Sequence, residues 1–100
     1  MEERIENITK MENILNHTNV LISEMENLLD NWKKNQAEFN ALMNYYGSPE
    51  WHQDREDDEH RRLPVDLPRG VLSEDSVHNT YGERKEILIK MIRVAVAGLE

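Results

Sequence analysis

The sequence contains no cysteine, and that absence excludes disulfide bonds, zinc sites ligated by cysteine and thiol catalysis. Long hydrophobic runs are also missing, since no apolar segment approaches the roughly 20 residues of a membrane-spanning helix. The first residues lack the basic and apolar regions of a signal peptide. We therefore expect a cytoplasmic protein that does not enter a membrane.

Positive charge is scarce as well. The 100 residues include 20 Asp and Glu against 12 Lys and Arg, which gives a formal net charge of −8. No segment is basic enough to neutralise several phosphates, so nucleic-acid binding is not expected. A chain of this length buries only about two thirds of its unfolded surface, which leaves little material for a deep substrate cleft and favours association with another chain.

Glycine and proline are unevenly distributed. Residues 1–46 contain neither, whereas all three prolines and two of the four glycines fall between 47 and 70. This distribution predicts a long helix over 1–46, a connector over 47–72 made of a short charged helix and an extended strap, and a C-terminal helix over 73–99. We expect one all-α domain over 1–100, a helical hairpin or bundle in which the C-terminal helix packs antiparallel on the long helix.

Apolar residues recur with a heptad period along the first part. Only Thr18 and Gln36 interrupt two rows of apolar side chains, and a third row widens the stripe beyond a two-position coiled-coil pattern, as is typical of helical bundles. The first row is Ile8, Leu15, Ile22, Leu29 and Met43; the second is Met11, Met25, Trp32, Phe39 and Tyr46; the third is Ile14, Leu21, Leu28 and Leu42.

A straight helix over 3–46 would be roughly 65 Å long, more than a 100-residue globule can cover. Either the helix breaks between Leu29 and Asn35, where weak helix formers cluster, or its uncovered half pairs with a second copy. The unbroken heptad phase favours the second solution. We predict a homodimer joined through a seam of five residues: Ile8, Met11, Leu15, Thr18 and Ile22.

The C-terminal helix is expected to begin after Ser73, whose side chain can cap it. Between 87 and 97 only Lys90 and Arg93 are polar, and a helix that is apolar all round needs neighbours on several sides. Gly82 leaves open whether this part is one helix or two. The apolar pattern predicts a core that includes Ile22, Leu29, Trp32, Phe39, Trp51, Leu88, Ile92 and Ala95.

Two motifs lie in and around the connector. In the first, Gly47 is expected to end the long helix while Ser48 caps the next helix and Pro49 opens it. Trp51 should then point back toward the end of the long helix, near Phe39, Met43 and Tyr46. In the second, Arg69 should be held by Asp66 or by carbonyls at a helix end, and Gly70 should take a positive φ. The strap should dock on the bundle through Leu63, Val65, Leu67, Val71 and Leu72.

Taken together, the segments Tyr45-Tyr46-Gly47-Ser48-Pro49-Glu50-Trp51 and Leu63-Pro64-Val65-Asp66-Leu67-Pro68-Arg69-Gly70-Val71-Leu72-Ser73-Glu74-Asp75 resemble a family of small bacterial proteins classed as a domain of unknown function. The resemblance extends over nearly the whole chain. It implies a helical cytoplasmic protein without an established activity, and it assigns no catalytic or binding residue.

The stretch from His52 to His60 concentrates side chains that bind metals. On a helix, His52, Glu56 and His60 share one face. Their spacing differs from the zinc signature in which two histidines four apart ligate the metal, and the glycine and final acid of a calcium loop are missing. We interpret the stretch as a solvated face with internal pairs such as Arg55 with Glu59, and predict neither a metal site nor a cofactor.

Nothing in the sequence indicates catalysis. Capping explains Ser73, no triad spacing surrounds it, and glycine loops for phosphates are absent. We therefore predict a non-enzymatic interaction or structural module that forms a homodimer. The alternative is an acidic protein that sequesters an unidentified basic partner protein. Its contact surface would be Asp54, Glu56, Asp57, Asp58 and Glu59.

Overall fold

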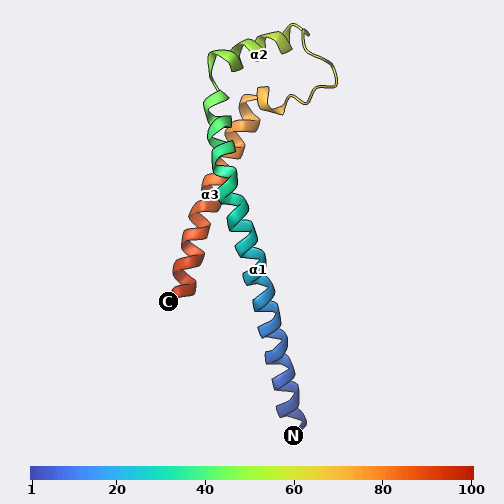
Figure 1. The fold of residues 1–100 in the computed structure, drawn as a ribbon, viewed down its shortest axis with the longest axis vertical. Helices are drawn as coiled ribbons and strands as arrows, with labels where there is room; N and C mark the ends of the chain where they lie inside the picture. Colours follow the sequence, from blue (N-terminus) through green and yellow to red (C-terminus); the bar gives the residue numbers. More distant parts are fainter. The chain divides into compact units, whose positions relative to one another are not determined.

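A computed structural model describes all residues from Met1 to Glu100 and shows an all-α fold without strands. The helices are α1 (Glu2–Tyr45), α2 (Pro49–Glu59) and α3 (Glu74–Leu99), and one turn of 3-10 helix, η1 (Gly70–Leu72), precedes α3 (Figure 1). The predicted all-α class, with a long N-terminal helix and a C-terminal helix, is confirmed. Met1–Ala41 and Leu42–Glu100 form two compact units.

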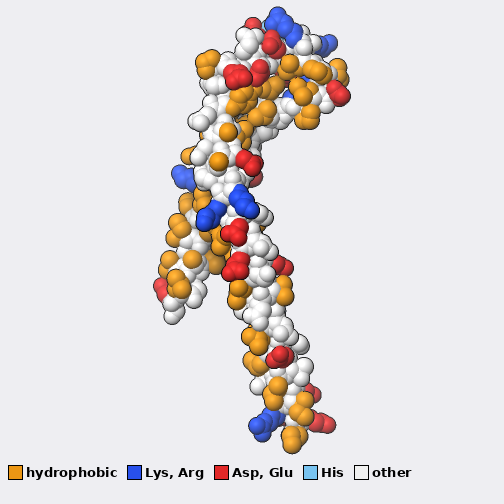
Figure 2. All heavy atoms as spheres, viewed as in Figure 1, with side chains coloured by type: hydrophobic (Ala, Val, Ile, Leu, Met, Phe, Trp, Pro, Cys, Tyr) orange, Lys and Arg blue, Asp and Glu red, His pale blue; other side chains and the backbone are white.

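Helix α1 is continuous for 44 residues. It does not break between Leu29 and Asn35, so the alternative of a turn at this point is wrong. None of its residues is buried. Ile8, Met11, Leu15 and Ile22 of the seam are between 48% and 59% exposed, and Thr18 is exposed as well. Figure 2 shows apolar side chains at the surface along the length of this helix.

Local signals define the turn from α1 into α2. Gly47 adopts a φ of +78°, a left-handed conformation that glycine takes without steric cost, and so ends α1. The Oγ of Ser48 accepts a hydrogen bond of 3.1 Å from the backbone N–H of Trp51, and Pro49 opens the helix. The predicted cap at Ser73 is also present, since its Oγ accepts from the N–H of Ser76 at 3.4 Å.

Beyond Gly47, the connector has its left-handed residue just after α2 and not at Gly70. Arg61 adopts a φ of +57°, while Gly70 does not have a positive φ, so the prediction for Gly70 is wrong. The N–H of Arg62 donates to the carbonyl of Asp57 at 2.8 Å, and that of Arg61 donates to the carbonyl of Asp58 at 3.1 Å. These two bonds form the motif that usually places glycine in the left-handed position.

Helix α3 continues through Gly82 to Leu99 as one element. Its apolar side chains remain exposed on several sides, among them Ile87, Ile89, Ile92, Val94, Val96 and Leu99. No helix of the chain combines the length and the apolar character that crossing a membrane requires.

The buried apolar residues are few, namely Trp51, Leu72 and Val77. The predicted burial of Trp51 is confirmed, whereas Trp32, Phe39 and Leu88 are only half-buried. The prediction is wrong for four exposed positions, Ile22, Leu29, Ile92 and Ala95. A heptad pattern identifies the face of a helix that avoids water, but it does not show whether the same chain covers that face.

Candidate functional site

The connector is organised around Trp51, which is only 2% exposed. Its ring meets the ring of Tyr46 edge to face, with centroids 5.2 Å apart and an interplanar angle of 72°. The indole Nε1 donates a hydrogen bond of 2.9 Å to the carbonyl of Val71. The predicted position of Trp51 beside Tyr46 is therefore confirmed, and the indole joins the end of α1 to η1.

Arg55 extends this cluster toward α3. Its guanidinium carbon lies 5.3 Å from the centroid of the Trp51 ring, and its Nη1 donates to Oε1 of Glu74 at 2.8 Å. The Tyr46 hydroxyl donates to the backbone carbonyl of Glu74 at 3.3 Å. The expected partner Glu59 lies farther away, with 4.0 Å between its Oε1 and the Nε of Arg55. Arg55 therefore links α2 to the first turn of α3.

Arg69 holds the strap. Its Nη1 donates to the carboxylate of Asp58, and its remaining donors bind backbone carbonyls of the strap itself. The expectation that Asp66 or a helix end would hold Arg69 is wrong, because the carboxylate is that of Asp58 and the carbonyls lie in the strap. These carbonyls are those of Pro64 (2.6 Å), Val65 (3.2 Å) and Leu67 (3.2 Å).

The strap therefore closes around a guanidinium group rather than docking by apolar side chains. Of its predicted anchors, Leu72 is buried and Leu63 is half-buried, but Val65 is 97% exposed and Leu67 and Val71 are also exposed. The docking prediction is wrong for these last three residues. Backbone carbonyls that bind Arg69 satisfy the polar groups of a segment without regular secondary structure, so the strap does not need an apolar anchor at each position.

Three of the five acidic residues of the predicted partner surface accept hydrogen bonds from neighbouring side chains. Asp54 accepts from the Tyr45 hydroxyl at 2.5 Å, and Asp58 accepts from Arg69. Asp57 accepts from Nη1 of Arg62 at 3.0 Å and from Nε2 of Gln53 at 3.1 Å. Glu56 and Glu59 are exposed. Figure 2 shows acidic and basic side chains intermixed over this region, so the surface is not uniformly negative.

One family model, a domain of unknown function (DUF4298), matches residues 8–94. The chain belongs to this family. No curated protein and no solved structure matches it. The match includes the entire connector of the DUF4298 chain and all five seam residues, and it confirms the predicted resemblance to a domain of unknown function.

Titration of Tyr45 reports on the connector of this DUF4298 chain. Hydrogen bonding to Asp54 is the main cause that raises the pKa of Tyr45 from 10.0 to about 12, with smaller effects from burial and from the charges of Asp54 and Glu50. Because the bond requires the neutral phenol, its contribution to folding is complete below pH 10 and is lost as the pH rises through 12.

We expect ultraviolet absorbance to show one of the three tyrosines ionising near pH 12. The variant Asp54→Asn removes the negative charge, so its Tyr45 should ionise closer to pH 10. Tyr45→Phe identifies the transition, because it should abolish the late phase alone. A late phase that persists in Tyr45→Phe would assign the raised pKa to another tyrosine.

The DUF4298 chain contains no group of three or more acidic or histidine side chains placed to hold a metal ion. Within the histidine-rich face of α2, the Nδ1 of His60 lies 2.9 Å from the carbonyl oxygen of Glu56. We expect zinc and calcium to leave the melting temperature unchanged. A melting temperature that rises with metal concentration and returns with chelator would instead show binding to the folded state. The double variant His52→Ala/His60→Ala then tests whether α2 is responsible.

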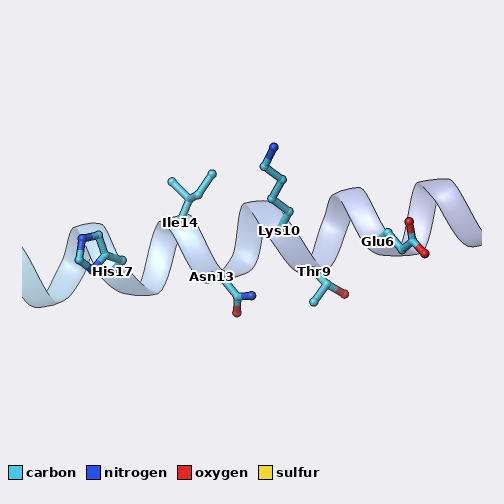
Figure 3. Close-up of a pocket in the computed structure, with 6 residues that line it drawn as sticks. All are labelled: Glu6, Thr9, Lys10, Asn13, Ile14 and His17. Atoms are coloured by element: carbon cyan, nitrogen blue, oxygen red, sulfur yellow. The ribbon is translucent and has the colours of Figure 1, made fainter.

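Two shallow recesses lie on α1 alone. The first is lined by Glu6, Thr9, Lys10, Asn13, Ile14 and His17. Figure 3 shows Lys10 and Ile14 pointing away from Asn13 and Thr9, so these side chains do not converge on a common ligand. The second is mainly apolar and is lined by Thr18, Leu21, Ile22, Glu24, Met25 and Leu28. Only the second recess has the composition of a protein contact.

Proposed function

We propose that this DUF4298 chain is a non-enzymatic helical interaction module that self-associates through the first half of α1. The observation that carries this proposal is the exposed seam, in which four apolar side chains repeat with a heptad period and remain about half exposed. A contiguous apolar surface of this kind marks a protein contact. The regular heptad spacing suits another helix as its partner.

The length of α3 limits what the chain itself can cover. The start of α3 is tied to the end of α1, because the Tyr46 hydroxyl bonds the carbonyl of Glu74. A helix of 26 residues spans about 39 Å, which corresponds to about 26 residues of another helix. Whatever direction α3 takes from this point, it is therefore too short to reach much beyond residue 20 of α1. Most of the seam lies farther from Tyr46 than this limit, so a second copy is the cover we propose.

The alternative, an acidic module that sequesters a basic partner, has less support. Three of its carboxylates already have internal partners: Asp54 binds Tyr45, Asp57 binds Arg62 and Asp58 binds Arg69. A basic partner would have to displace these internal bonds, or it would leave them intact and gain little binding energy. Of the predicted surface, only Glu56 and Glu59 are exposed. Two surface carboxylates contribute little affinity by themselves.

Light scattering coupled to size-exclusion chromatography tests the proposal. Across micromolar concentrations the measured mass should be about twice the 11.8 kDa of one chain. The mass should approach 11.8 kDa on dilution, since a dimer dissociates by mass action. A mass of one chain at every concentration would refute self-association.

A further inference from the structure

We infer that the two α1 helices of the dimer run antiparallel, with Ile22 of one copy opposite the partner's Met25. This inference rests on the proposed self-association and specifies its geometry. Three observations support it. They are the position of the third apolar row on one side of the seam, the sizes of the residues in the first and second rows, and the charges beside those rows.

The two flanks of the seam differ. On one flank lies the third apolar row, in which Ile14, Leu21 and Leu28 are 50–56% exposed. On the other flank lies a polar row made of Glu12, Asn19, Glu26 and Lys33. All of these residues belong to the uninterrupted helix α1, so the two flanks stay on opposite sides of the seam.

Helix direction decides which flanks meet. In a parallel pair each flank contacts the opposite flank of the partner, so Leu21 would lie beside the partner's Glu26 and Leu28 beside the partner's Lys33. In an antiparallel pair each flank contacts its own counterpart, so Leu21 meets the partner's Leu28. Of the two directions, only the antiparallel one buries Leu21 and Leu28 of the third row against apolar side chains, and removing this apolar surface from water stabilises the dimer.

Residue sizes along the first and second apolar rows also favour this direction. A parallel pair places Thr18 against the partner's Thr18 and Trp32 against the partner's Trp32. The two small side chains would leave a gap, and the two large ones would be crowded. The antiparallel pair places small against large. Thr18 then meets the partner's Leu29, and Leu15 meets the partner's Trp32.

Charge selects the register. With Ile22 opposite the partner's Met25, Glu12 faces the partner's Lys33 and Asn19 faces the partner's Glu26. A shift of the partner helix by one heptad in one direction places Glu12 beside the partner's Glu26. A shift by one heptad in the other direction places Glu26 beside the partner's Glu26. Opposite charges across helices favour one alignment and like charges disfavour the others.

The apolar recess on α1 coincides with the centre of this arrangement. Its lining residues Leu21, Ile22, Met25 and Leu28 are the ones that pair across the two-fold axis, Leu21 with the partner's Leu28 and Ile22 with the partner's Met25. A two-fold interface uses the same patch on both copies, so the patch must complement itself. In this register the seam meets residues 25–39 of the partner's α1.

Electron-spin distance measurements test the inference without changing the seam. The chain has no cysteine, so Lys10→Cys, Glu24→Cys and Lys34→Cys can each carry one spin label. In the antiparallel register, each labelled position is separated from the same position of the partner along the helix axis. At 1.5 Å per residue, this separation is about 40 Å at Lys10, about 2 Å at Glu24 and about 30 Å at Lys34. Two long distances should therefore flank one short distance.

The outcomes separate this inference from the proposed function. Three short distances in a protein with the mass of a dimer would overturn the antiparallel direction and leave self-association intact. A dimeric mass without measurable coupling at any of the three positions would contradict a dimer joined through α1. A monomeric mass would refute the proposed function itself.

Charge reversal provides an independent test of the register. Glu12→Lys should weaken the dimer about fivefold, because two symmetric ion pairs are replaced by like charges. Adding Lys33→Glu to the same chain should restore the affinity. Glu6→Lys, on the face of α1 away from the seam, is the matched control and should change it little. Failure of the double variant to recover would overturn the register.

Discussion

Replacing Trp51 by alanine should lower the free energy of unfolding of residues 42–100 by about 3–5 kcal/mol, the cost of emptying a site filled by a large aromatic side chain. Trp51 is the largest fully buried side chain of the protein. Its loss also leaves the carbonyl of Val71 without the indole donor and removes the ring over which Arg55 lies. A small unit with a total stability of about 5–15 kcal/mol would lose a large part of it.

Hydrogen exchange of the α2 and η1 amides measures this loss directly, because α1 dominates the helical signal of the whole chain. Trp51→Phe is the matched control: it keeps an aromatic ring in the site but removes the N–H donor, so it should cost about 1–2 kcal/mol. Equal protection of these amides in the wild type and in Trp51→Ala would show that Trp51 does not hold the connector together.

Leu15→Glu should convert the dimer to a monomer at micromolar concentration. Each copy would bring a carboxylate into an apolar contact, next to the partner's Trp32 in the antiparallel register. An unpaired charge placed in such a contact costs several kcal/mol, enough to raise the dissociation constant at least about 100-fold. The light-scattering mass should fall from twice the chain mass to 11.8 kDa.

Asn13→Glu is the matched control for this variant, because it adds the same charge to the same part of α1 on the face away from the seam. Its mass should remain that of the wild type. Neither substitution lies in the unit formed by residues 42–100, so hydrogen exchange of α2 and η1 should be unchanged in both. If both variants keep the dimeric mass, the seam is not the interface.

The helix ends of the connector could be predicted because their causes are local. Gly47, Ser48, Pro49 and Ser73 each act through backbone groups no more than one turn away, so the residue type and its neighbours suffice. The contact of Trp51 with Tyr46 extends this reasoning over five residues and one turn of known geometry.

The ion pairs of the connector could not be predicted in the same way. Asp54, Asp57 and Asp58 are chemically alike, and the backbone path determines which hydrogen-bond donor reaches each of them. That path depends on Arg61, whose left-handed φ carries the chain away from α2 although the residue is not a glycine. The partners of Asp58 and Arg55 lie 11 and 19 residues along the chain, beyond the range of local patterns.

Periodicity predicted the apolar faces of the helices but not their burial. Ile22 and Ile92 both lie on regular apolar rows, and both are exposed. A pattern describes what one helix needs, whereas burial depends on a second surface at the right distance. The exposed positions are therefore informative, since they indicate where a further chain is required.

The hydrogen bonds that close the connector join residues only 9 to 28 positions apart. Short loops close quickly, and native contacts between residues near in sequence allow fast folding. The connector should thus form in a first-order step whose rate is independent of protein concentration. Pairing of two α1 helices is second-order and becomes slower on dilution. During refolding, each chain should therefore complete its connector before it meets a second copy. The two molecules then associate with the capped helix ends of the connector already formed.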